Sequence, residues 1–261
     1  MELLTFNPEQ FKVFFLILIR VSTVLFLYPI FGSVMFPVLI KVGLSVTLSV
    51  IFFPIVSIDP RLFPKSVIEF LVLVVCELMV GLTLGLTVRL FFAGIQLAGQ
   101  MVGFQMGFAI INVIDPQSGT QVSIIDQIGY WVVLLVFLVL NGHHALISGL
   151  AESFKLVAVG SFVLKPALMS MLLSIAANVF VIAIKVGSPA IAALLLTSAA
   201  FGISAKFAPQ MNILIAAFPV KIVVGLIFFG VSIQIVSIVT RSYLTSLHSL
   251  ITSLLIRAGG A

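Results

Sequence analysis

The chain has 261 residues, of which 62% are hydrophobic and only 8% are charged. Water-soluble domains carry about a quarter charged residues, so this composition excludes a water-facing globule and makes the lipid bilayer the expected solvent. The net charge of +5 comes from lysines and arginines that are spread along the chain without a block of like charge, which argues against nucleic acid as a partner.

Apolar runs of about 20 residues, the length that crosses a bilayer, predict an all-α membrane protein with about six hydrophobic helices. In chain order the runs cover Phe11 to Tyr28, Val38 to Val56, Phe70 to Phe92, Gly129 to Leu150, Ala167 to Leu196 and Ile213 to Val239. Proline and glycine turn signals separate them. We expect several helices to be broken, the fifth in particular, because Lys185, Gly187 and Pro189 interrupt it.

The predicted organisation is one multi-helix membrane domain over residues 1–239, followed by a C-terminal tail over residues 240–261. The tail is rich in Ser, Thr and Leu and contains Arg241, His248 and Arg257. This composition is typical of an amphipathic helix at the membrane interface or in the cytoplasm. Placing both ends of the chain in the cytoplasm puts most lysines and arginines on that side, so we expect this orientation.

Charged residues interrupt the apolar helices at several points. On insertion scales each costs about 2.5 to 3.5 kcal/mol at the bilayer centre, so such side chains cannot simply face lipid. They could pair inside the chain or reach the membrane surface, or their helices could face other subunits or an aqueous path. The residues concerned are Arg20, Glu77, Lys185 and Lys221, with Lys41 and Arg89 nearer the helix ends.

A ladder of residues at intervals of four occupies the third apolar run. It contains Glu77, Gly81, Gly85 and Arg89. Residues at this spacing share one stripe of a helix, and the two glycines let another backbone approach closely. That backbone could belong to the same chain or to another subunit.

The segment from Gly94 to Asp126 is too polar for a lipid-facing helix. Gly99, Gly103 and Gly107 repeat every four residues, and glutamines lie between them. The pattern favours a helix facing a lumen, followed by irregular backbone, which membranes tolerate only where protein or water surrounds it. The alternative is an ordinary polar loop outside the membrane.

Catalytic and ligand-binding motifs are weak or missing. The pair His143-His144 suggests a metal site. However, adjacent histidines point in different directions on a helix, and the sequence has no zinc-binding spacing around them. The sequence contains neither a nucleotide-binding G-x-x-x-x-G-K-[ST] motif nor a nucleophile elbow. We therefore predict no metal, no cofactor and no enzymatic activity.

Short motifs follow one another in a characteristic order along nearly the whole chain. They are Arg20-Val21-Ser22, Pro29-Ile30-Phe31-Gly32, Pro37 with Lys41, Glu77 with Gly81 and Gly85, Gly103 to Gly107 leading to Asp115-Pro116, Asn141-Gly142-His143-His144, Ser153-Phe154, Ser188-Pro189-Ala190, Ala208-Pro209-Gln210-Met211-Asn212, and Phe218-Pro219-Val220-Lys221-Ile222 with Gly225. In this order and spacing, the chain resembles the FliR/SctT family of type III secretion export-gate membrane proteins, in its flagellar form.

The resemblance implies helical hairpins, lifted partly out of the bilayer, within a hetero-oligomeric gate in the bacterial inner membrane at the flagellar basal body. The implied partners are FliP and FliQ, with FlhB beside them, and unfolded flagellar subunits would pass through the gate.

The resemblance also implies that residues 103–122 form a plug in the channel. Under this hypothesis apolar side chains seal the channel, glycines let the plug move, and an Asp-Pro pair belongs to the gating loop. The residues are Met106, Phe108, Ile110 and Ile111 for the seal, Gly103 and Gly107 for the movement, and Asp115 and Pro116 in the loop.

Two other functions remain as alternatives. A secondary transporter for a small solute would use broken helices around charges at the bilayer midplane, but it predicts internal repeats that the sequence does not contain. An intramembrane hydrolase would depend on His143 or His144.

Overall fold

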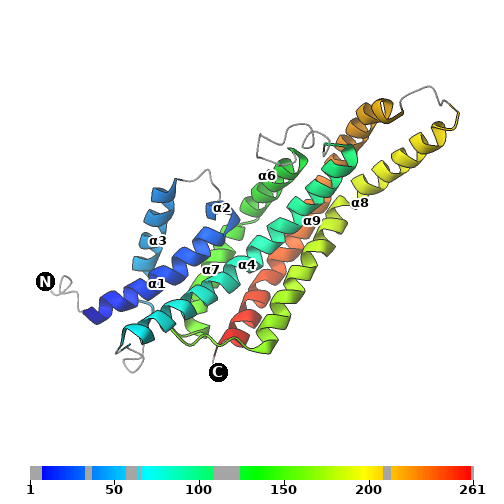
Figure 1. Ribbon diagram of the computed structural model, residues 1–261. Helices are drawn as coiled ribbons and strands as arrows, with labels where there is room; N and C mark the ends of the chain where they lie inside the picture. The colour runs from blue at the N-terminus through cyan, green and yellow to red at the C-terminus, as the bar shows by residue number, and fades with distance from the viewer. Residues whose placement is uncertain are drawn as a thin grey trace. The chain divides into compact units, whose positions relative to one another are not determined.

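The computed structural model describes residues 8–32, 37–56, 64, 66–108, 124–207 and 213–259. Apart from one antiparallel bridge between Phe162 and Gly259, the regular structure of these residues is helical, which confirms the predicted all-α fold. The helices are α1 (Pro8–Leu27), α2 (Pro29–Gly32), α3 (Val38–Phe52), α4 (Val67–Met106), α6 (Ile124–Val139), α7 (Gly142–Leu156), α8 (Pro166–Ser204) and α9 (Ile213–Ala258) (Figure 1).

Each of the six predicted apolar runs lies in a helix or a helix pair, but not every run is long enough to span. Within the described residues, α1, α4, α8 and α9 contain spans of sufficient length and apolarity. Helices α6 and α7 together make a fifth candidate, bent by 72°. Helix α3 has only 15 residues. The chain is therefore a multi-pass membrane protein, with four or five candidate spans in the part that the structure describes.

The bend between α6 and α7 falls inside the predicted fourth run. Asn141 adopts φ 57° and ψ 29°, and Gly142 begins the next helix. Asparagine tolerates this left-handed conformation better than most residues because its short polar side chain can bond locally. The Asn-Gly pair therefore bends the chain within a run that hydropathy predicts as one continuous helix.

The predicted break in the fifth run is wrong. Helix α8 continues from Pro166 to Ser204 with Pro189 inside it. A proline removes one backbone donor, and helices of membrane proteins accommodate that loss through local adjustment and neighbouring helices. Helix α9 likewise contains Pro219 and runs on to Ala258, through most of the expected tail. The division at residue 239 stays a prediction.

The chain forms two compact units, each assembled from segments distant in sequence. Unit 1 comprises Met1–Leu90, Asn141–Ile175 and Leu244–Ala261, and unit 2 comprises Phe91–Leu140 and Ala176–Tyr243. Helices α4, α8 and α9 contribute residues to both units, whereas α1, α2, α3 and α7 belong to unit 1 and α6 belongs to unit 2.

In unit 1, helix α1 packs against the glycine ladder of α4. A Cβ atom at Gly81 would lie 2.7 Å from Thr23 Cβ, and one at Gly85 would lie 2.5 Å from Leu27 Cβ. Real Cβ atoms do not approach so closely, so these positions have room only for glycine. The backbone that approaches the ladder thus belongs to the same chain.

In unit 2 the last turns of α4 pack against α6, α8 and α9. A Cβ atom at Gly94 would lie 3.0 Å from Ile182 Cβ on α8, and one at Gly99 would lie 2.6 Å from Asp126 Cα on α6. The rings of Phe91 and Tyr243 stack with centroids 3.9 Å apart, which joins α4 to α9. Small residues on α4 therefore set the spacing of its partner helices.

Candidate functional site

The end of helix α4 leads into the predicted plug and is fixed by a specific cap. The Gly107 N–H donates to Phe104 O at 3.0 Å, and the Phe108 N–H donates to Gly103 O at 3.1 Å. These two bonds are those of a Schellman motif, in which the residue after the helix adopts a positive φ. Gly107 has φ 95°, so glycine is required there.

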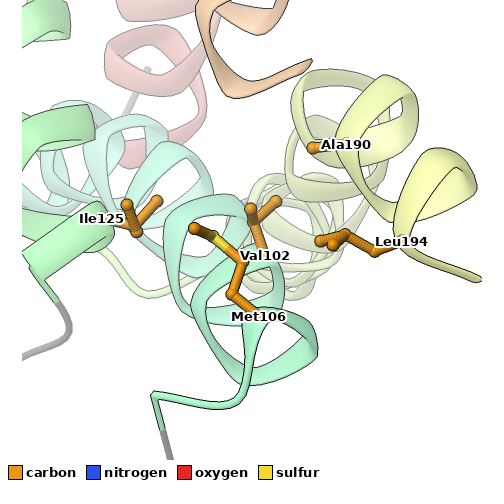
Figure 2. Close-up of a cluster of buried hydrophobic side chains, with 5 residues drawn as sticks. All are labelled: Val102, Met106, Ile125, Ala190 and Leu194. Atoms are coloured by element: carbon orange, nitrogen blue, oxygen red, sulfur yellow. The ribbon is translucent and has the colours of Figure 1, made fainter. Parts of the chain in front are cut away.

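A buried apolar cluster surrounds the last two turns of α4. Figure 2 shows Val102 and Met106 on α4 between Ile125 of α6 on one side and Ala190 and Leu194 of α8 on the other. Met106 has no exposed surface, and Phe108 packs against the cluster while partly buried. Two residues predicted to seal a channel are therefore anchored within unit 2.

Helix α9 closes the same cluster through two close contacts. A Cβ atom at Gly107 would lie 2.2 Å from Cε1 of the Phe218 ring. A Cβ atom at Gly225 would lie 2.5 Å from Met106 Cγ. Both glycines thus keep space for a large side chain of the neighbouring helix. The Phe218 contact was not foreseen, because no sequence spacing links it to residue 107.

The side chain of Gln100 links α4 to the first turn of α6. Gln100 Nε2 donates to Asp126 Oδ2 at 3.1 Å. Asp126 is only 5% exposed, and its Oδ1 atom is buried without a hydrogen-bond partner among the described residues. A carboxylate in the first turn of a helix is favoured by the helix dipole. This hydrogen bond joins two polar residues of the segment from Gly94 to Asp126.

The remaining predicted plug residues, Ile110, Ile111, Asp115 and Pro116, lie outside the described residues, as does most of the segment 103–122. Gly103 is buried in the last turn of α4. The role of all these residues in a channel stays a prediction.

Unit 1 contains a fully buried ion pair between Arg20 and Glu77. Arg20 Nε lies 2.6 Å from Glu77 Oε2, and Arg20 Nη2 lies 3.1 Å from Glu77 Oε1. Both side chains have no exposed surface. Two charges that the sequence placed within apolar helices therefore pair inside the chain, which is one of the alternatives left open by the sequence.

The same arginine also holds the end of helix α7. Its Nη1 atom donates to the carbonyl oxygens of Ser153 and Val157, each at 3.0 Å, and its Cζ atom lies 4.4 Å from the centre of the Phe154 ring. The last carbonyls of a helix lack internal partners and attract a cation. The sequence pointed to Arg20 but not to these carbonyl partners.

Glu77 has a second partner in the turn after α7. The Gly160 N–H donates to Glu77 Oε1 at 2.9 Å, and Gly160 has φ 79°. A Cβ atom at Gly160 would also lie 2.2 Å from Leu73 Cδ2. The buried pair therefore joins α1, α4 and the end of α7 in one network.

Three of the other charges singled out in the sequence are more accessible, whereas Lys41 on α3 is buried. Arg89 and Lys185 are exposed, and Lys221 is half-buried. Lys185 lies in the middle of α8, between Phe180 and Leu195, which are 64% and 53% exposed. A cation within such an apolar surface cannot remain in hydrocarbon without a partner or water.

The two histidines singled out for metal binding lie at the start of α7. Their rings are 4.2 Å apart, centre to centre. Among the described residues no group of three or more His, Cys, Asp or Glu side chains could hold a metal ion. The absence of a metal stays a prediction.

Comparison with known proteins gives a consistent result. The model of the family described as "Bacterial export proteins, family 1" matches residues 11–247. The chain is 34% identical over 237 residues to the flagellar biosynthetic protein FliR of Bacillus subtilis (strain 168), covering 90% of this chain and 91% of the relative. It is 29% identical to FliR of Aquifex aeolicus (strain VF5), covering 91% and 92% of the two chains. It is also 29% identical to FliR of Escherichia coli (strain K12), covering 82% of each.

Proposed function

This chain belongs to family 1 of the bacterial export proteins, and we propose that it is a non-enzymatic subunit of the gate that exports flagellar subunits. In this proposal it assembles with FliP and FliQ, with FlhB beside them, in the inner membrane at the flagellar basal body. Unfolded flagellar proteins pass through the resulting channel. The match over residues 11–247, together with relatives that cover nearly the whole chain, carries the proposal.

The lengths of the helices support a protein environment around part of the chain. Helix α4 has 40 residues, which corresponds to about 60 Å. The hydrocarbon core of a bilayer is only about 30 Å thick. Exposed apolar side chains occur near both ends of α8, for example Met169 and Ile203. Lipid can cover only part of this length, so partner subunits would cover the rest.

The accessible lysine of α8 supports the same environment. Lys185 is exposed among apolar side chains, and the only described carboxylate of unit 2, Asp126, is buried beside Gln100. A partner subunit or an aqueous path would supply the compensating charge or water.

The anchored end of α4 supports a gate segment that begins at a fixed point. The cap at Gly107 and the burial of Met106 hold the chain where the segment starts. Ile110 and Ile111 follow directly and would seal the channel. In this proposal the cap places Gly107 at the base of the segment, where the movement predicted for the plug would begin.

Co-purification tests the assembly. The tagged chain is expressed with FliP and FliQ of the same organism and purified in mild detergent, and we expect all three proteins in one complex. Lys185→Glu should weaken the complex, whereas Lys206→Glu, at an exposed lysine in the turn after α8, should not. Purification of this chain alone or as a homo-oligomer would contradict the proposal and favour a transporter.

Ion leakage tests the seal. Cells carrying Ile110→Ser with Ile111→Ser should leak ions through the gate, because hydroxyl groups hydrate a constriction that apolar side chains keep dry. The matched variant Ile110→Val with Ile111→Val should remain tight. Replacement of residues 109–122 by a Gly-Ser linker of equal length should leak more, and flagellin export should be measured in parallel. A tight membrane with normal export would rule out the plug.

A further inference from the structure

Asp126 is a carboxylic acid that the chain itself encloses. Its side chain is 5% exposed, and the buried Oδ1 atom has no hydrogen-bond partner among the described residues. Oδ2 accepts one hydrogen bond, from Gln100 Nε2 at 3.1 Å. The chain alone provides this enclosure, so neither lipid nor a partner subunit touches Oδ1 while the packing stays as it is. A buried polar atom without a partner needs a physical explanation.

The surroundings of Asp126 are apolar and closely packed. The preceding residue, Ile125, is 1% exposed and belongs to the cluster with Val102 and Met106 that Figure 2 shows between α4 and α6. A Cβ atom at Gly99 would lie 2.6 Å from Asp126 Cα, so the first turn of α6 touches the backbone of α4. Two backbones in such close contact leave no room for water between them.

The charged and titratable groups around Asp126 do not neutralise it. Helices α4, α8 and α9 pack against this end of α6. Helix α4 has no titratable residue between positions 90 and 106, α6 adds Tyr130 one turn beyond Asp126, and α8 and α9 contribute Lys185, which is exposed, and Lys221, which is half-buried. Among the described residues no ion pair joins Asp126 to either lysine.

An ionised carboxylate in this position would lose most of its hydration and gain little in return. One amide N–H and the dipole at the start of α6 favour the negative charge, but both are weak compared with the hydration that a carboxylate loses on burial. Without a compensating charge, a buried acid becomes neutral by taking up a proton. A metal ion would need several further oxygen ligands, and no group of three or more His, Cys, Asp or Glu side chains lies within the described part of the chain.

We propose that Asp126 is a proton-binding site, protonated while α6 packs against α4 and ionised when the first turn of α6 moves away from Gly99. In the packed state Gln100 donates to the carbonyl oxygen Oδ2, and Oδ1 is the hydroxyl oxygen. On separation the O–H bond of the carboxyl group breaks, and the proton passes to the water that reaches the site. Because only the packed state holds the proton, acidic pH favours packing and alkaline pH favours separation.

This proton site lies at the base of the proposed plug. Helix α4 ends at Met106 and α6 begins at Ile124, so the two helices carry the two ends of the segment between them. The hydrogen bond from Gln100 to Asp126 therefore holds these ends together. The proton site itself depends only on the packing of unit 2, whereas its effect on the plug rests on the proposed function, in which protonation of Asp126 favours the closed gate.

Infrared spectroscopy of the full-length protein in lipid nanodiscs detects the proton directly, because a protonated carboxyl group absorbs at a higher frequency than the amide backbone. At neutral pH we expect such a band. Asp126→Asn should remove it, whereas Glu152→Gln, at a carboxylate that is 24% exposed, should leave it unchanged. Gln100→Ala, at an exposed side chain, should shift the band to higher frequency because the carbonyl oxygen loses its donor, and this shift assigns the band even if the Asp126→Asn protein does not fold. A spectrum without a carboxyl band that responds to either variant would overturn the proposal.

Hydrogen exchange tests the coupling between the proton and the packing. The protection of the backbone amides in the first two turns of α6 is compared between the wild-type and Asp126→Asn proteins at the same pH, so the intrinsic pH dependence of exchange cancels. At neutral pH both should be protected. At alkaline pH the wild-type protein should lose this protection, whereas the Asp126→Asn protein, which cannot ionise, should keep it.

Gln100→Ala separates the hydrogen bond from the proton. It should weaken the protection at every pH and keep the pH dependence of the wild-type protein. Equal protection of the wild-type and Asp126→Asn proteins at all pH values would overturn the proposal. Both measurements use the purified chain, so they stand even if the ion-leakage experiment rules out the plug.

Discussion

The two units differ in the contacts that join their helices. Unit 1 is joined by a buried ion pair, Arg20 with Glu77, whose hydrogen bonds reach the backbone at the end of α7. Unit 2 is joined around Met106 by apolar side chains and close glycine contacts. The stability of a buried ion pair depends on both charged partners, because removing one of them leaves the other charge buried and uncompensated. An apolar cluster loses only contacts when a side chain is shortened. The two units should therefore respond differently to substitution.

The largest effect is expected from Arg20→Ala. It leaves Glu77 buried without its partner, and removing one member of a buried pair costs about 3–5 kcal/mol. Thermal unfolding of the purified protein and its level in membranes measure the loss. The double variant Arg20→Met with Glu77→Leu should be less destabilised than Arg20→Ala, because no charge stays buried. A double variant that is even less stable would contradict the comparison.

A smaller loss is expected in the apolar cluster. Met106→Ala should cost about 3 kcal/mol, through lost contacts and a cavity between α4, α6 and α8. Met101→Ala, at an exposed methionine on the same helix, should change the stability by about 0.5 kcal/mol or less. Thermal unfolding in the same detergent compares the two. Equal effects would show that Met106 does not anchor the end of α4.

The cap of α4 should respond by a smaller amount. Gly107→Ala places a side chain at φ 95° and against the Phe218 ring, and the backbone strain alone costs about 1–2 kcal/mol. Gly230→Ala, where the added Cβ atom meets nothing within 4 Å in helix α9, should stabilise by about 0.5–1 kcal/mol. Opposite signs in thermal unfolding would confirm the cap. A destabilised Gly230→Ala protein would indicate a general intolerance to alanine.

The smallest effect is expected from the contact between His248 and Glu152 in unit 1. His248 Nδ1 lies 3.4 Å from Glu152 Oε2, and the histidine side chain is 75% exposed. Glu152→Gln keeps an acceptor for the Thr252 hydroxyl group, which donates to Glu152 Oε1 at 3.1 Å. The stability should change by less than about 1 kcal/mol. A loss as large as that of Arg20→Ala would show that burial does not distinguish the two pairs.

The sequence could predict the all-α membrane fold because the bilayer imposes a strong and local constraint. Backbone groups in hydrocarbon must bond within their own segment, so long apolar runs become helices. The positions at which a helix ends or bends were less predictable. The proline in α8 interrupts one hydrogen bond without ending the helix, whereas the Asn-Gly pair before α7 turns the chain.

The candidate site was predictable only in part. Glycine spacing marked the α4 surface where another backbone approaches, and the cost of buried charge marked Arg20 and Glu77 as residues that need partners. The partners themselves depend on contacts between distant segments. Ser153 lies 133 residues from Arg20, and Phe218 is more than a hundred residues from Gly107.

The sequence by itself determined that the chain leaves water, that its apolar runs become helical and which residues are costly to bury, because hydropathy and the cost of a charge in hydrocarbon are local properties. Only the tertiary structure decided how those costs are met. It paired Arg20 with Glu77, left Lys185 exposed and turned the polar side of α3 inward. These outcomes depend on which surfaces meet, and the packing of whole helices decides that.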